Sequence, residues 1–232
     1  MRAAHEVAHV LRTLGPAVEQ LGLSDYLLRH LRALRDCRTA ALGGHIDKCN
    51  DCHEVHISYN SCRNRHCPKC MGHKRHEWMQ ARIQELLPVP YFHVVFTLPQ
   101  ALNGLAIHAP RLVYKALFDA SWQTLAQFCQ AKGLLGGMVA ILHTWGQNLS
   151  LHPHLHCIVP GGGIATGGHW QALPAHGKYL FSVKAMSKVF RAKYVAQLRA
   201  GGITDKVLLD SLFTKDWVVY SKRPFGTPEN LI

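Results

Sequence analysis

The stretch NLSLHPHLHCIVPGGG, residues 148–163, places two histidines two positions apart in a largely apolar segment. On a β-strand, side chains two positions apart point to the same face, so His154 and His156 would project together and Leu155 would point away. Two imidazoles on one face can converge on a single ion, although a hydrogen-bonded histidine inside a core is a common alternative. The stretch therefore predicts a strand that carries part of a divalent-metal site.

A third ligand for this ion would have to come from a neighbouring element. The preceding apolar run, residues 138–145, predicts a strand, and His143 and Gln147 lie at its end. Two neutral imidazoles with an amide or a third imidazole leave coordination positions open for oxygen atoms. Such a site favours Mg²⁺ or Mn²⁺, which would polarise a phosphate and position it for attack.

The elements around the histidine strand occur in an informative order. Apolar periodicity and turn residues predict a strand, a helix, two strands, a helix and a strand, at residues 91–97, 110–131, 138–145, 154–160, 184–199 and 216–221. This order is typical of the split βαβ, ferredoxin-like arrangement, in which two helices cover one face of an antiparallel sheet. Glycines at 161–163 and 167–168 indicate a flexible turn after the third strand. The predicted fold class is α+β.

Cysteines are concentrated ahead of this domain. Cys49 and Cys52 form one CxxC pair, and Cys67 and Cys70 form another inside a segment without a sustained apolar period. Two such pairs supply four thiolates for a tetrahedral ion, and zinc is the ion that thiolates favour in a cell. The sequence therefore predicts a zinc-ribbon-like module with Cys49, Cys52, Cys67 and Cys70 as ligands.

Further metal-binding and basic residues surround these pairs. A second tetrahedral zinc site could be formed by Cys37, His45, Cys62 and His66, unless the spare histidines are exposed or face phosphate. Cationic side chains lie between and after these ligands in the sequence: Arg63, Arg65, Lys69, Lys74 and Arg75. A zinc module with a basic surface is typical of nucleic-acid binding, with a protein-contact surface as the alternative.

The whole composition agrees with a polyanionic partner. The chain has 26 Lys and Arg against 14 Asp and Glu, a formal charge of +12. It contains no apolar run of the roughly 20 residues that a membrane helix needs, and no secretion signal at its start, so we expect a cytoplasmic, nucleoid-associated protein. Prolines at 88 and 90 separate helices and a zinc module, residues 1–90, from the sheet domain, residues 91–232.

Four strings carry a resemblance to a known family, and they are CRTAALGGH (37–45), YNSCRNRHCPKC (59–70), HTWGQNLSLHPHLHCIVPGGG (143–163) and KRPFGTPE (222–229). Together they resemble the insertion-sequence-ninety-one transposases, which move by a rolling-circle route. The resemblance implies an N-terminal zinc-binding domain and an HUH endonuclease domain, named after a motif of two histidines around a hydrophobic residue, here His154, Leu155 and His156. It also implies a tyrosine that attacks single-stranded DNA and leaves a 5′-phosphotyrosine, with Mg²⁺ or Mn²⁺ polarising the phosphate.

The family's nucleophiles are a pair of tyrosines on a helix after the KPFG-like string. No such pair occurs before the chain ends at Ile232, so we expect the sheet domain to be incomplete at its C-terminus, with Tyr194 on the predicted helix as the remaining candidate. Two functions stay open. The chain is a transposase that nicks and joins single-stranded transposon ends, or a truncated DNA-binding protein that does not cleave. A replication initiator or relaxase would share the histidine pair, but the zinc strings fit it poorly.

Overall fold

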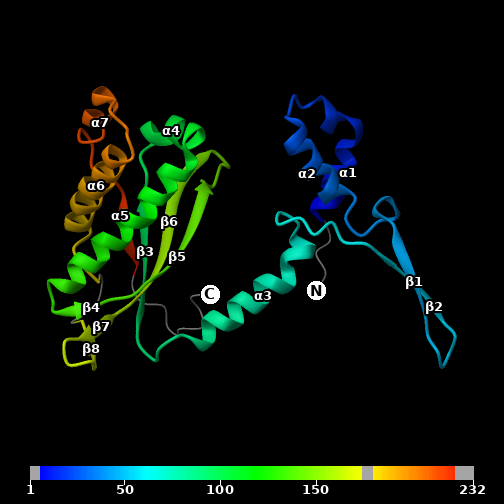
Figure 1. Cartoon of the computed structure of the whole chain (residues 1–232), viewed down its shortest axis with the longest axis horizontal. Coiled ribbons are helices and arrows are strands. Elements are labelled where there is room, and N and C mark those ends of the chain that lie inside the picture. The colour runs from blue at the N-terminus through cyan, green and yellow to red at the C-terminus, as the bar shows by residue number, and fades with distance from the viewer. Residues whose placement is uncertain (1–5, 174–179, 223–232) are drawn as a thin grey trace. The chain divides into compact units, whose positions relative to one another are not determined.

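The computed structural model describes residues 6–173 and 180–222, and it divides the chain into two compact units, Met1–Gln84 and Glu85–Ile232 (Figure 1). The sequence placed this boundary a few residues later, after residue 90. Most of the KRPFGTPE string lies outside the described residues. No helix in the described ranges is long and apolar enough to cross a membrane.

The first unit begins with helices that bury a small apolar cluster. α1 (Val7–Leu14) and α2 (Asp25–Arg35) are joined by the 3₁₀ turn η1 (Gly15–Gln20), and a second short turn, η2 (Ala40–Leu42), follows α2. Leu11 and Leu34 pack with two buried cysteines, Cys37 and Cys67. This core is small, so the unit needs an additional source of stability.

A two-stranded antiparallel hairpin and a long helix complete this unit. The hairpin consists of β1 (Gly44–Lys48) and β2 (Val55–Tyr59), and the helix is α3 (Pro68–Gln84). α3 begins at the second CxxC pair, within the segment where the sequence shows no sustained apolar period. No residue of α3 is buried, so apolar periodicity could not reveal its first half.

The second unit is built on a four-stranded antiparallel sheet with the order β5-β6-β3-β9. Its strands are β3 (Tyr91–Thr97), β5 (Val139–Trp145), β6 (Leu151–Pro160) and β9 (Val219–Lys222). The long helices α5 (Pro110–Gln130) and α6 (Val183–Ala200) follow the first and third of these strands in the chain. The predicted ferredoxin-like α+β arrangement is therefore confirmed.

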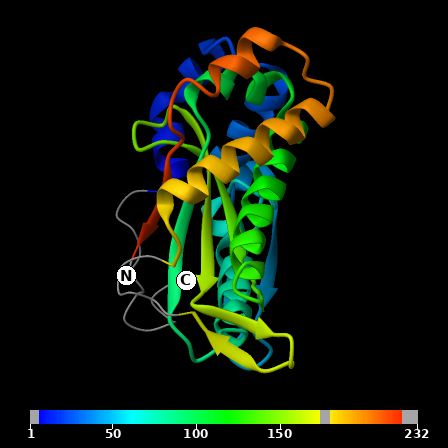
Figure 2. The same ribbon diagram turned by 90° about the vertical axis from the view of Figure 1, so that its left-hand side faces the viewer.

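Both long helices lie on one face of this sheet, as Figure 2 shows with α5 and α6 in front of the strands. Phe92, Val94 and Phe96 alternate along β3 and are completely buried in the core on the helix side. Because side chains alternate between faces, His154 and His156 point to the opposite face, as the sequence predicts. We call this second face the histidine face.

The second unit also contains shorter strands and helices. A small antiparallel sheet is formed by β4 (Leu134–Leu135), β7 (Gly162–Ala165) and β8 (Trp170–Ala172), and the remaining pieces are η3 (Gln100–Leu102), α4 (Asn103–His108) and α7 (Lys206–Ser211). The expectation of a flexible turn at 161–163 is wrong, since Gly162 and Gly163 lie in β7. A Cβ on Gly163 would lie 2.6 Å from the Leu135 carbonyl oxygen, so glycine permits close strand pairing there.

Candidate metal centres

Four cysteines of the first unit come together in one group: Cys37, Cys62, Cys67 and Cys70, with all their sulfur atoms within 4.8 Å of one another. Cys70 Sγ lies 3.5 Å from Cys37 Sγ and 3.6 Å from Cys62 Sγ. Four sulfurs at about 2.3 Å from a tetrahedral zinc would be separated by about 3.8 Å. The group therefore has the size and ligand chemistry of a structural zinc site.

The acidities of these thiols also fit a bound cation. Burial raises the pKa of Cys62 to about 12. Burial would likewise raise the pKa of Cys70, but hydrogen bonds from Cys37, Cys62 and Cys67 outweigh it and bring that pKa down to about 7. The Cys70 thiol therefore ionises more readily than the Cys62 thiol, and a bound cation would favour the ionised form of both.

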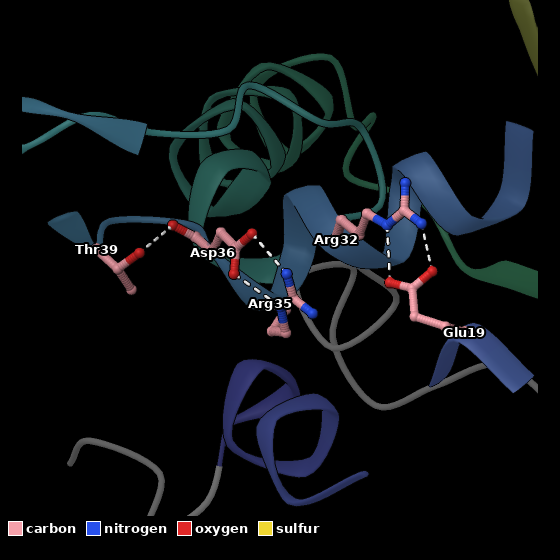
Figure 3. Close-up of polar contacts among 5 residues, drawn as sticks. All are labelled: Glu19, Arg32, Arg35, Asp36 and Thr39. Carbon is pink, nitrogen blue, oxygen red and sulfur yellow. Dashed lines mark hydrogen bonds and ion pairs between the residues drawn. The ribbon is translucent and has the colours of Figure 1, made fainter. Parts of the chain in front are cut away.

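Local contacts position the first ligand, Cys37, directly after α2. Asp36 accepts hydrogen bonds from the Arg35 guanidinium, and its carbonyl oxygen accepts one from Thr39 Oγ1 at 2.7 Å (Figure 3). Glu19 forms a two-point contact with Arg32 on the same helix, which ties η1 to α2. These contacts fix the turn in which Cys37 lies.

The structure groups the cysteines differently from the predicted zinc ligand set. Cys67 and Cys70 are paired with Cys37 and Cys62, whereas Cys49 and Cys52 are exposed at the tip of the β1-β2 hairpin. Each hairpin strand has five residues, so at about 3.3 Å per residue the tip lies about 16 Å from the base. The base is close to the four-cysteine group, because Arg38 N–H donates to the Asn60 carbonyl oxygen.

The two histidines predicted for a second zinc site lie apart from this group. His45 is exposed on β1 with Nε2 3.6 Å from an Asp47 carboxylate oxygen. His66 is exposed, and its ring centroid lies 5.7 Å from that of His30. Among the described residues, neither belongs to a group of three or more potential ligands. Cys37 and Cys62 therefore belong to the four-cysteine group, and His45 and His66 do not.

The second unit carries a group of three histidines: His143, His154 and His156, each with a ring nitrogen within 4.8 Å of the others. His143 on β5 is the Cα partner of His154 on β6, so the two side chains share a face. All three are half-buried. The pairing register thus brings the predicted third imidazole to the predicted pair. Gln147, the alternative ligand, is exposed in the turn between the strands.

The environment favours the neutral form of two of these imidazoles, those of His143 and His156. Burial, helped by the nearby His143, His93 and His154, lowers the pKa of His156 to about 4, and burial with His154 also lowers the pKa of His143. Neutral imidazoles offer lone pairs to a cation, which protonated ones cannot. The group can therefore hold a divalent ion at neutral pH.

The sequence missed a fourth histidine beside this group. His93 on β3 has Nε2 2.7 Å from His156 Nδ1, and the two rings are stacked at 4.9 Å. Metal-binding histidines commonly use their second ring nitrogen in this way, which fixes the orientation of the ring. His93 alternates with buried residues of β3, and this signal would have placed it on the histidine face, but it does not show that the His93 ring contacts His156.

Two aromatic side chains on the histidine face were also missed. Trp145 is 54% exposed, and its ring is stacked on His143 with centroids 5.6 Å apart and planes 6° apart. Tyr220 on β9 is 52% exposed, and it shares with His156 the strand partner Val95. Exposed rings beside a metal site are surfaces on which planar groups can stack.

Tyr194, the predicted remaining nucleophile, lies in the core of the second unit. Its side chain on α6 is completely buried, its hydroxyl donates to the Val113 carbonyl oxygen at 3.3 Å, and burial raises its pKa well above the ordinary range. It also lies on the helix side of the sheet, opposite the histidines. Tyr194 is a core residue, as tyrosines on amphipathic helices usually are.

The cationic residues of the first unit lie on its surface. Arg63, Arg65, Lys69, Lys74 and Arg75 are all exposed. Lys69 Nζ is 2.6 Å from Glu6 Oε2, so part of its charge is neutralised within the unit. The others are available to a polyanion.

Fold and sites together define a zinc-binding protein with a ferredoxin-like domain that carries a three-histidine centre on its open face. Two family profiles match the chain: one described as a transposase zinc-binding domain at residues 10–98, and one described as a "Putative transposase" at residues 137–232. The chain belongs to the transposases of the insertion-sequence-ninety-one type.

Two relatives named as transposases agree with this assignment. The chain is 39% identical to "Putative transposase y4qJ" of Sinorhizobium fredii (strain NBRC 101917 / NGR234), with 100% of this chain and 63% of the relative covered. It is 32% identical to "Transposase for insertion sequence element IS801" of Pseudomonas savastanoi pv. phaseolicola, with 70% and 40% covered. The chain thus spans less than two thirds of each relative. A metal-bound structure of conjugative relaxase TrwC with oriT DNA is 16% identical, with a TM-score of 0.38 over 47% of this chain and 43% of that one.

Proposed function

We propose that this chain provides the DNA-binding and metal-binding parts of a transposase that nicks and joins single-stranded DNA. The observation that carries the proposal is the group of His143, His154 and His156 on the open face of the sheet. Two relatives named as transposases support it, although the chain spans only part of each.

A Mg²⁺ or Mn²⁺ ion held by these imidazoles would polarise the scissile phosphate. The chain's own residues contribute the imidazole ligands, the His93 contact that orients His156, and a face open enough for a strand of DNA. Trp145 and Tyr220 add exposed aromatic rings on which unpaired bases can stack. A single strand is the form of DNA that offers its bases in this way.

The proposed cleavage joins a tyrosine to DNA. The tyrosine oxygen forms a bond to phosphorus and loses its proton, the bond from phosphorus to the 3′ oxygen breaks, and that oxygen takes up a proton. Attack by another 3′-hydroxyl reverses these steps and joins the strands. The resemblance places the tyrosines after the KRPFG string, so we propose that the nucleophile is supplied from outside residues 1–232.

The first unit would bind DNA independently of cleavage. The four-cysteine group, with zinc, stabilises a unit whose apolar core is small, and Arg63, Arg65, Lys74 and Arg75 present positive charge on its surface. We propose that these residues contact the phosphates of transposon ends.

Manganese binding to the zinc-loaded chain tests the histidine centre. Electron paramagnetic resonance should detect a single bound Mn²⁺ that raises the affinity for a single-stranded oligonucleotide. The variant His154→Ala/His156→Ala should lose both effects, and His169→Ala, an exposed histidine on the β7-β8 turn, should keep them. Equal manganese binding in the double variant would refute the proposal. DNA binding that is indifferent to Mn²⁺ and to the histidines would favour a DNA-binding protein that does not cleave.

A denaturant-resistant protein-DNA adduct tests where the nucleophile lies. If it is supplied from outside, the chain alone binds DNA and forms no adduct. An adduct that Tyr220→Phe abolishes and Tyr194→Phe preserves would instead place the nucleophile on β9.

A further inference from the structure

A groove with a volume of about 940 Å³ lies at one end of the sheet of the second unit. Three segments line it: the end of β3 with η3 and the start of α4, the β5-β6 turn, and the segment between α7 and β9. Figure 1 shows α4, α7 and this turn at the same end of the sheet. Pockets for small molecules have volumes of roughly 300–1,000 Å³, so the groove can take a group of that size.

The groove lies next to the histidine centre. Thr97, which lines it, is the Cα partner of His154, and such partners on antiparallel strands lie about 5 Å apart. His152, also in the lining, has its ring centroid 5.3 Å from that of His154. A phosphate at the three histidines would therefore have its own nucleotide, or the next one, at the mouth of the groove.

The walls of the groove are held by hydrogen bonds within the unit. Asn103 Nδ2 donates to the Leu151 carbonyl oxygen at 2.8 Å, which joins α4 to the start of β6. Trp217 Nε1 donates to the Leu212 carbonyl oxygen at 2.9 Å. Asn148 Oδ1 accepts from the backbone and hydroxyl of Ser150 in the β5-β6 turn. The groove is thus formed before any ligand arrives, which reduces the entropic cost of binding.

The chemistry of the lining favours a base over a phosphate. The lining contains one lysine, Lys215, and one aspartate, Asp216. It also contains amide and hydroxyl side chains such as those of Gln100 and Thr214. A phosphate-binding pocket would carry a surplus of positive charge. Hydrogen-bonding groups without that surplus suit a neutral, planar, polar ligand.

We infer that this groove binds one unstacked nucleobase of the DNA strand, next to the phosphate held at the histidine centre. The inference rests on the proposed function. It makes the end of β3, the β5-β6 turn and residues 211–218 the part of the protein that reads sequence beside the cleavage position.

Asp216 predicts which base the groove prefers. A carboxylate accepts hydrogen bonds from the exocyclic amino groups of cytosine, adenine and guanine, and thymine has no such group. The groove should therefore bind cytosine better than thymine, bases of similar size.

Matched variants test the groove by fluorescence anisotropy with labelled oligodeoxycytidine and oligothymidine of equal length, in Mn²⁺. Thr214→Trp should fill the groove and weaken oligodeoxycytidine binding by at least about five-fold, whereas Thr166→Trp on the exposed β7-β8 turn should not. Asp216→Ala should remove the preference for cytosine, and Asp210→Ala on α7 should keep it. Equal effects within either pair would overturn the inference.

Photocrosslinking locates the base directly. Oligodeoxycytidine containing 5-iododeoxycytidine should crosslink, in the full chain with Mn²⁺, to peptides that include residues 97–103, 148–152 or 211–218, and Thr214→Trp should suppress these crosslinks. If Mn²⁺ and DNA bind through the histidines but crosslinks form only elsewhere, the groove inference fails and the proposed function stands. If the chain binds neither, both fail.

Discussion

At the scale of single residues, the contact between His93 and His156 determines how the metal site can be used. His156 has Nδ1 2.7 Å from His93 Nε2, so its Nε2 is the nitrogen left to face an ion. The bond also fixes the ring plane. A cation at this centre would therefore find the His156 imidazole already oriented. The orientation requires a second half-buried histidine, His93.

Replacing His93 should weaken the metal site without removing a ligand. We expect His93→Phe to lower the affinity for Mn²⁺ by about ten- to 100-fold, the usual effect of losing a residue that orients a ligand. His93→Gln can still hydrogen-bond to His156 and should restore most of the affinity. The exposed His108→Phe is the matched control. Titration followed by electron paramagnetic resonance gives the affinities, and an unchanged value in His93→Phe would show that the contact orients nothing.

The lowered histidine pKa values predict how stability depends on pH. The folded state keeps His156 neutral down to about pH 4, while the unfolded chain binds a proton near pH 6.5. This contribution to stability is therefore fully present above about pH 6.5 and is lost as the pH falls towards about 4. In urea denaturation of the second unit without added divalent ions, His156→Gln should show a smaller loss of stability over this window than the parent protein. An identical loss would mean that the other titrating groups account for it.

At the scale of elements, the zinc group connects the end of α2 to the start of α3. Cys62→Ser should release the ion and unfold the first unit, because its apolar core is small and metal binding supplies folding free energy. Cys52→Ser changes an exposed hairpin thiol and should leave the ion of the four-cysteine group and the thermal transition unchanged. Metal analysis and calorimetry on both variants check this. If Cys52→Ser also unfolded the unit, the hairpin tip would be part of the structural site.

The histidine face should depend on its exposed tryptophan for DNA. One side of the Trp145 ring is stacked on His143, and more than half of the side chain remains accessible to a base. We expect Trp145→Ala to weaken single-stranded DNA binding by about 1–3 kcal/mol, the usual contribution of one stacked base. Trp122 is also exposed, at 37%, but it lies on α5, on the helix side of the sheet, so Trp122→Ala should have little effect. Equal losses in the two variants would exclude stacking at Trp145.

How far the sequence predicts these elements depends on the forces that form them. The ferredoxin-like sheet is stabilised by buried apolar residues such as Phe92 and Phe96. Their alternation is visible in the sequence, so the order of the elements and the two faces of the sheet could be predicted. The HUH pair and His143 followed from strand geometry. The ligands of the four-cysteine group could not be predicted in the same way, because their spacing pairs the CxxC motif of Cys67 and Cys70 with the other CxxC motif. Its partners depend on where the hairpin turns, and the exposed α3 leaves no apolar period to mark its start.

At the scale of the whole molecule, the charge of +12 should make DNA binding strongly dependent on salt. Each phosphate neutralised on a single strand contributes about −0.7 to the slope of log K against log salt concentration. Lys74 and Arg75 are exposed on α3, and no ion pair to either is among the contacts of the described part of the chain. They are therefore the clearest candidates for phosphate contacts in the first unit.

The variant Lys74→Gln/Arg75→Gln should make this slope shallower by about 1.4, two contacts of about 0.7 each. Lys184→Gln/Lys188→Gln removes the same charge from exposed positions on α6, away from the histidine face, and should change the slope by less than one contact. Fluorescence anisotropy at several salt concentrations gives both slopes. If both double variants shift it equally, DNA responds to the net charge of the molecule and not to a surface on α3, because a diffuse attraction does not distinguish where the charge is removed.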